Sequence, residues 1–157
     1  MDLSLMTNGG RLNIRVAAVI TDGDKILIEQ GDGVPFAVCP GGRINFGETA
    51  ENAIVREIYE ELSVLSKVVR PLYVHQNFFD MDGIRNHELC FFFLLETGLT
   101  ACGNPTIRGR DNSSTYRWVS FDELQNLAFY PIFLKKTISN LPQGVELITE
   151  IENNEVR

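Results

Sequence analysis

Long apolar runs are missing from this sequence. The longest, residues 89–95, is far too short to span a bilayer as a helix. The opening MDLSLMTNGGR has no basic start followed by an apolar stretch, so no signal peptide is expected. These absences argue against a membrane protein and predict a soluble protein of the cytoplasm.

Cysteine and positive charge are also scarce. The three cysteines, Cys39, Cys90 and Cys102, are widely spaced and form no CxxC pair, which argues against a disulfide framework or a structural zinc site. Lys and Arg number 14 against 21 Asp and Glu, so the net charge is −7. A surface this acidic repels a polyphosphate backbone, and we expect no nucleic acid polymer as a partner. A small anionic substrate would need a cation where the charges meet.

The 157 residues, 44% of them hydrophobic, are enough for one domain with its own core, so residues 1–157 are predicted to form a single domain. Strand-like segments lie on either side of one strong helix, which favours an α+β fold with a mixed or antiparallel sheet. Residues 12–21 and 25–30 are predicted to form a hairpin. The other predicted strands are 36–38, 68–79, 87–96, 115–119 and 145–151, and the helices are 49–62, one starting at 120–123, and 131–140.

The predicted helix 49–62 carries too many acids on one face. Glu57, Glu60 and Glu61 stand at spacings i, i+3 and i+4, beside the apolar stripe that faces the core. Like charges at these spacings destabilise a helix by roughly 0.2–0.5 kcal/mol per pair. Most acidic helix faces are simply solvated, and an Arg56–Glu60 pair would relieve some of the repulsion. The alternative is that a hard cation with oxygen ligands, such as Mg²⁺, binds there.

The glycine-containing loop before this helix decides between the two interpretations. From Gly42 the chain is GRINFGETAENAIVREIYEELSV, which resembles the Nudix box GX5EX7REUXEEXGU, where U is a bulky aliphatic residue. Eight of the nine specified positions match, so coincidence is not a serious explanation. Ser63 stands in place of the second glycine, which leaves the way the helix ends open.

The resemblance implies a Nudix-type α/β/α sandwich with a mixed sheet, in which the box forms a loop–helix–loop. It further implies hydrolysis of a diphosphate linkage in a nucleoside-diphosphate-linked compound or a nucleoside triphosphate, by a metal-activated water that attacks phosphorus. The cofactor would be Mg²⁺, for which Mn²⁺ may substitute, and the partner a small nucleotide-type substrate.

Residue by residue, the resemblance makes Glu57, Glu60 and Glu61 metal ligands, and Glu57 also a candidate general base. Gly42, or the neighbouring Gly41, would offer a backbone carbonyl to the metal. Arg56 would orient the glutamates, and Glu48 would brace the loop. Members of the family also use acids outside the box, and the candidates for such a role are Glu88, Asp111 and Glu96.

Two other functions stay open on sequence grounds. The first is a nucleotide-binding sensor or regulatory domain without turnover, suggested by Ser63 and by the lack of a clear acid outside the box. The second, diphosphate isomerisation on the same scaffold, needs further groups that the sequence does not reveal. The substrate-binding residues cannot be read from the box, and a free edge strand is compatible with a homodimer.

Overall fold

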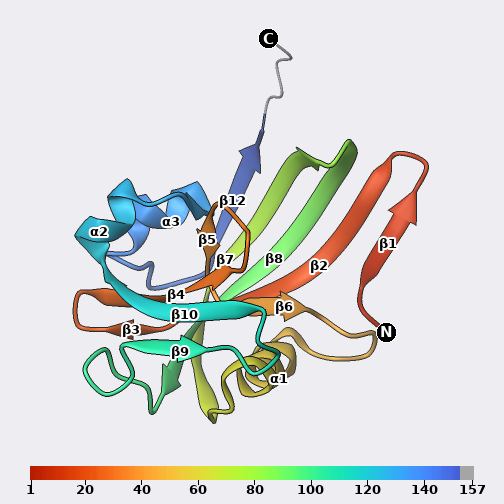
Figure 1. The fold of residues 1–157 in the computed structure, drawn as a ribbon. Helices are drawn as coiled ribbons and strands as arrows, with labels where there is room; N and C mark the ends of the chain where they lie inside the picture. Colours follow the sequence, from red (N-terminus) through yellow and green to blue (C-terminus); the bar gives the residue numbers. More distant parts are fainter. Residues whose placement is uncertain (153–157) are drawn as a thin grey trace.

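The computed structural model describes residues 1–152 as twelve strands and three helices (Figure 1). The strands are β1 Ser4–Thr7, β2 Gly10–Val19, β3 Thr21–Asp22, β4 Lys25–Gly31, β5 Ala37–Val38, β6 Gly41–Arg43, β7 Ser66–Met81, β8 Ile84–Thr97, β9 Thr106–Arg108, β10 Ser114–Ser120, β11 Phe129–Tyr130 and β12 Glu146–Ile151. The helices are α1 Ala50–Leu62, α2 Phe121–Asn126 and α3 Ile132–Thr137.

The strands form two sheets that both mix parallel and antiparallel pairs. The first has the order β1-β2-β8-β7-β12, with β6 also paired to β2, and its parallel pairs are β2 with β8 and β7 with β12. The second has the order β11-β5-β4-β10-β9, with β3 also paired to β4. The expectation of a mixed sheet is confirmed.

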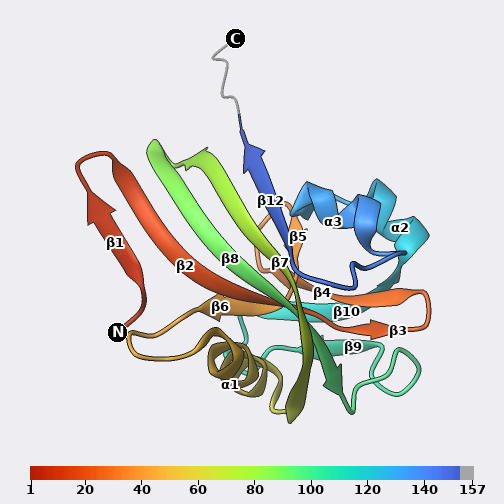
Figure 2. The same cartoon turned by 180° about the vertical axis from the view of Figure 1, so that it is seen from behind.

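The core has two layers because side chains alternate across β2. Ala17 and Val19 pack on one face with α2 and α3, while Val16 and Ala18 pack on the other face with α1. The helices therefore cover opposite faces of the sheet structure, as Figures 1 and 2 show from two sides. This is the layered α+β arrangement that the resemblance implied.

Most predicted elements are present, and the hairpin of residues 12–21 with 25–30 needs correction. β2 ends at Val19 and pairs with β1, β6 and β8 of the first sheet, and the short β3 alone folds back on β4. The chain thus passes from one sheet to the other at Ile20, a switch that no local pattern announces. The last helix is also shorter than predicted, because Pro131 stands just before α3 and the helical segment ends at Thr137.

Three features of the sequence can be checked directly in the described residues. The tail segment does form an edge strand, β12, parallel to β7. Cys39, Cys90 and Cys102 are all free, the first two buried and the third exposed. Across residues 1–152, no helix has the length and apolar character needed to cross a membrane.

Candidate active site

Helix α1 begins and ends with well-defined caps. Thr49 accepts a hydrogen bond from the backbone N–H of Asn52, which satisfies a donor that the first turn leaves free. At the other end Ser63 takes the left-handed conformation, with φ of 57°, and its backbone N–H donates to the carbonyl of Tyr59. Ser63 therefore ends the helix in the conformation that a glycine adopts more easily.

Arg56 is the centre of the acidic face of α1. Its guanidinium makes two hydrogen bonds to the carboxylate of Glu48, at 2.8 and 2.9 Å, and lies 2.8 Å from Glu57 and 3.2 Å from Glu60. A further donor of Arg56 reaches the carbonyl of Arg43 at 3.0 Å. The paired guanidinium lowers the pKa of Glu48 to about 2. One arginine thus ties the loop before the helix to two of the helix glutamates.

Each of the two glycines of the turn lacks space for a side chain, but a different neighbour occupies that space in each case. A Cβ on Gly41 would lie 2.2 Å from the backbone oxygen of Val16, because β6 runs close beside β2. A Cβ on Gly42 would lie 2.3–2.5 Å from the carboxylate atoms of Glu57. Gly41 is therefore needed for strand packing, whereas Gly42 leaves room for the Glu57 carboxylate against the backbone.

Glu61, at the last turn of α1, lies in a less polar environment. Burial and the charges of Glu29 and Glu57 raise the pKa of its carboxyl to about 9. One of its oxygens, Oε2, is buried and has no hydrogen-bond partner. The side chain of Glu60, by contrast, is 56% exposed. The described chain therefore leaves an acid oxygen unsatisfied at the end of the acidic face.

The donor set fits a hard divalent cation, although the acids are not gathered around one point. Among residues 1–152, no three His, Cys, Asp or Glu side chains form a group that could hold a metal ion as they stand. Arg56 engages Glu57 and Glu60 instead. The orphaned oxygen of Glu61 and the space that Gly42 leaves beside Glu57 both fit oxygen coordination of Mg²⁺.

The three acids proposed outside the box lie in different surroundings. Glu88 is largely buried and lies 3.9 Å from the guanidinium of Arg15. Asp111 is exposed and accepts two hydrogen bonds from Ser113 in its own loop. Glu96 is exposed near the end of β8, opposite Lys67. Burial lowers the pKa of Arg15, but the negative charge of Glu88, followed by those of Glu29 and Glu57, outweighs burial, and the pKa of Arg15 is raised. Of the three acids, Glu88 is thus connected to the box through Arg15.

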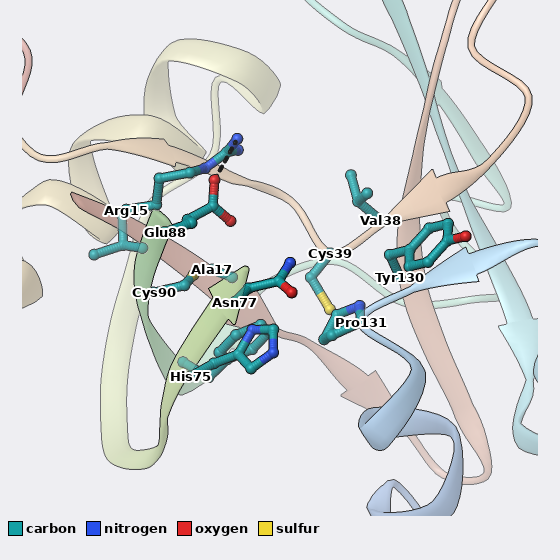
Figure 3. A pocket seen from close by; sticks show the side chains of 12 residues that line it. Arg15, Ala17, Val38, Cys39, His75, Asn77, Glu88, Cys90, Tyr130 and Pro131 are labelled. Carbon is teal, nitrogen blue, oxygen red and sulfur yellow. Dashed lines mark ion pairs between the residues drawn. The ribbon is translucent and has the colours of Figure 1, made fainter. Parts of the chain in front are cut away.

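A cavity of about 100 Å³ opens beside the glycine turn (Figure 3). Strands β2, β7 and β8 supply one side of it, with Arg15, His75, Asn77 and Glu88 directed toward it, and Tyr130 stands on the other side. Burial lowers the pKa of His75 to about 4, so this imidazole is neutral near pH 7. The remaining lining residues are Val16, Ala17, Val38, Cys39, Cys90, Phe92 and Pro131.

Glu29 was missed by reasoning from the sequence, although it lies next to the box. It stands on β4 directly opposite Tyr116 of β10, and its carboxylate accepts a hydrogen bond from Ser114 at 2.9 Å. One signal was available: the alternation along β4 puts Glu29 on the same face as the fully buried Leu27. Asn77 and His75 gave no comparable signal, because their neighbours in the cavity come from strands far apart in the chain.

Comparison with known proteins agrees with this geometry. The family model described as NUDIX domain matches residues 11–141. An ADP-ribose pyrophosphatase of Methanocaldococcus jannaschii is 32% identical over 119 residues, which are 74% of this chain and 66% of that protein, so the match spans slightly less than two thirds of the archaeal protein. A putative 8-oxo-dGTP diphosphatase of Bacillus subtilis is 30% identical over 132 residues, 82% of this chain and 78% of that protein.

The fold also matches solved structures. The mutator MutT protein of Bacillus halodurans superposes with a TM-score of 0.68 at 17% identity, over 90% of this chain and 92% of that one. A NUDIX hydrolase from Nitrosomonas europaea gives a TM-score of 0.60 at 16% identity, over 95% and 94% of the two chains. With the acidic helix, its arginine and its glycine turn in place, the chain belongs to the Nudix family.

Proposed function

We propose that this protein hydrolyses a diphosphate linkage in a nucleoside-diphosphate-linked compound or a nucleoside triphosphate, with Mg²⁺ as cofactor and Mn²⁺ as a substitute. The observation that carries this proposal is the Glu57 carboxylate, which lies against Gly42 at one end and is held by Arg56 at 2.8 Å. This arrangement joins the glycine turn and the acidic helix into one site.

Each box residue has a role in this proposal. Glu57, Glu60 and Glu61 bind the cation, together with the backbone carbonyl of Gly42, and Arg56 orients the carboxylates of Glu57 and Glu60. The bound cation would neutralise charge on the non-bridging phosphate oxygens and lower the pKa of a water. Glu57 would accept the proton of the attacking water as the water oxygen bonds to phosphorus. The bridging P–O bond breaks, and the leaving phosphate departs with its electron pair.

The cavity beside the glycine turn is suited to the part of the substrate that does not react. Val16 and Ala17, which line it, pair in register with Gly42 and Gly41 of β6, so the cavity and the turn are adjacent. Asn77 offers an amide donor and acceptor for a polar ring edge, and Tyr130 a ring face for stacking. Arg15 lies next to Glu88 and interacts electrostatically with Glu57. It would bind a phosphate of the substrate between the cavity and the acidic helix.

The relatives define the first substrates to assay. ADP-ribose and 8-oxo-dGTP follow from the names of the two relatives, and nucleotide sugars and dinucleoside polyphosphates complete the panel. We expect Mg²⁺-dependent release of a nucleoside monophosphate from at least one of them. Glu60→Gln and Glu61→Gln should each lower kcat/KM by a factor on the order of 10². Full activity of both variants on the best substrate would refute the role of the helix.

A second candidate is a sensor that binds a nucleotide without turnover. The observation in its favour is that Arg56 already engages two of the glutamates, while no three metal-binding side chains among residues 1–152 are gathered. Calorimetry separates the two candidates. Tight nucleotide binding without product after a long incubation with Mg²⁺ or Mn²⁺ would favour the sensor.

Cytoplasmic location and a homodimer complete the proposal. Three free cysteines in the described chain suit a reducing compartment. Strand β12 is an edge strand on which Leu147 and Ile151 are about two thirds exposed, at 66% and 65%, a surface suited to a second copy. Sedimentation analysis tests the dimer, and fractionation of the source cells tests the location.

A further inference from the structure

Glu29 comes from outside the box, on strand β4, yet its charge acts on Glu61 at the end of the acidic helix. On β4 it shares a face with Leu27, which packs in the same core layer as α1. Its partner across the sheet is Tyr116, also buried in that layer. Burial and the charges of Glu61 and Glu29 raise the pKa of Tyr116, whose hydroxyl interacts with both carboxyl groups. The two acids thus stand on either side of one buried tyrosine.

Among the described residues, Glu29 and Glu61 differ from several other acids in having no ion-pair partner. Glu48 is paired with Arg56, Glu88 with Arg15, and Asp32 with Arg108. Within residues 1–152, neither Glu29 nor Glu61 has an ion-pair partner within 4 Å. Their hydrogen-bond donors are the neutral hydroxyls of Ser114 and Tyr116. The charge of Arg15 acts on both acids but forms an ion pair with neither, so two neighbouring, partly buried acids have no direct charge partner in the described chain, which is unfavourable.

The position of Glu29 is fixed by its neighbours rather than free to turn away. The hydroxyl of Ser114 donates to Oε1 of Glu29 at 2.9 Å, and Ser114 itself is buried. Strand β10, which carries Ser114 and Tyr116, pairs with β4 along its whole length. The β9–β10 loop is tied to α1, because the backbone N–H of Arg110 donates to the carbonyl of Glu61 at 2.9 Å. Strand β4 and the end of α1 are therefore held in one rigid frame.

We propose that Glu29 is a further carboxylate of the metal site, supplied by β4 rather than by the box or by the loop that carries Asp111, and that Tyr116 is its positioning residue. This inference rests on the proposed metal-dependent function. With Glu29 included, the acids of the site come from a helix and from a strand, and Oε2 of Glu61 is the buried oxygen left without a hydrogen-bond partner in the described chain. A cation placed there would offset the charges of both acids.

The decisive measurement is metal binding by the intact protein without substrate. MnCl2 is titrated calorimetrically into the wild type and into Glu29→Gln. We expect the variant to bind Mn²⁺ at least ten times more weakly. Its Tm in EDTA should be equal to or higher than that of the wild type, because the substitution replaces a partly buried carboxyl beside Glu61 with a neutral amide. A residue with only a structural role would instead lower the Tm in EDTA and leave metal affinity unchanged.

Three controls make the result specific. Glu96→Gln removes an exposed acid elsewhere and should leave Mn²⁺ affinity unchanged. Asp111→Asn removes the rival acid outside the box and should weaken binding less than Glu29→Gln. Glu60→Gln tests the box itself. An unchanged affinity in Glu29→Gln, with a weakened one in Glu60→Gln, overturns this inference alone, whereas unchanged affinity in both also overturns the proposed metal function.

Tyr116→Phe provides a second test that does not touch a carboxylate. It keeps the ring in the core and removes only the hydroxyl that interacts with Glu29 and Glu61. We expect Mn²⁺ to bind about three to ten times more weakly, since one hydrogen bond contributes about 0.5–1.5 kcal/mol to fixing a group. If Glu29→Gln does not fold, this variant decides: wild-type affinity in a folded Tyr116→Phe protein would refute the proposal.

Discussion

Glu48 shows at the scale of one residue how a charge pair stabilises the site. Its pKa is lowered to about 2 by Arg56, from an ordinary value of 4.5. A carboxyl with a depressed pKa stabilises the fold above pH 4.5, and this stabilisation is lost as the pH falls from 4.5 toward 2. We expect Glu48→Gln to lower the Tm at pH 7, with the difference from the wild type vanishing near pH 2. A difference that stays constant with pH would contradict the charge argument.

Ser63 pays a conformational cost at the end of α1. The left-handed conformation costs a non-glycine residue roughly 1–2 kcal/mol. A glycine avoids this strain, but part of the gain is offset because glycine has more conformational freedom to lose when the chain folds. We expect Ser63→Gly to stabilise the protein by about 0.5–1 kcal/mol, a rise in Tm of about 1–4 °C, with kcat unchanged. Thermal unfolding measures the gain, and Ser63→Ala, which keeps a Cβ, should give none.

At the scale of elements, strand β6 and helix α1 meet at the two glycines. Gly41→Ala places its Cβ against a backbone oxygen of β2, which cannot move aside, so we expect a strongly lowered Tm or no folded protein. Gly42→Ala places its Cβ against the flexible end of Glu57. We expect that variant to fold with a Tm near the wild-type value, and to lose activity by about tenfold or more because Glu57 is displaced. Equal effects on Tm in the two variants would contradict this distinction.

The elements themselves show what a sequence can and cannot reveal. Helix α1 was predictable because its caps, its apolar stripe and the box all lie within one continuous segment. The path of β2 was not, since its partners β6 and β8 are chosen by packing between distant segments rather than by the turn that follows it. Short strands form only because they pair with a neighbour that is distant in the chain or set by tertiary packing. β9 pairs with β10, and β11 pairs with β5.

The same limit applies to the site. The glutamates of the box were named from their spacing, and the contact of Arg56 with Glu60 follows from the i,i+4 spacing of a helix, whereas its contact with the adjacent Glu57 does not. Glu29 escaped notice because its importance depends on which strand lies beside the end of α1. Periodicity gives the face on which a side chain lies but not what that face meets.

For the whole molecule, the buried acid at the end of α1 links stability to pH and to metal. The pKa of Glu61 is raised to about 9. The folded protein then holds a proton that the unfolded chain has lost, so this group lowers stability as the pH rises from 4.5 to about 9. In EDTA we expect the Tm of the wild type to fall from pH 6 to pH 9 relative to that of Glu61→Gln. A parallel pH dependence of the two proteins would be evidence against the raised pKa.

Added metal should reverse this loss. A cation that binds the folded state alone at ten times its Kd stabilises by about 1.4 kcal/mol, or about 3–6 °C in Tm for a chain of this size. We expect this rise with Mg²⁺ or Mn²⁺ in the wild type and a much smaller one in Glu61→Gln. Differential scanning calorimetry with and without the ion measures it, and an equal rise in both proteins would place the ion elsewhere.

The cavity beside the glycine turn is lined in part by residues that make none of the hydrogen bonds of the acidic helix face. Asn77 on β7 and Tyr130 after α2 can therefore change while Arg56 and the glutamates keep their contacts. The residues that recognise the substrate can then change during evolution while the residues that carry out the chemistry stay the same. A library randomised at those two positions should yield variants with new substrate preferences and an unaltered dependence on metal.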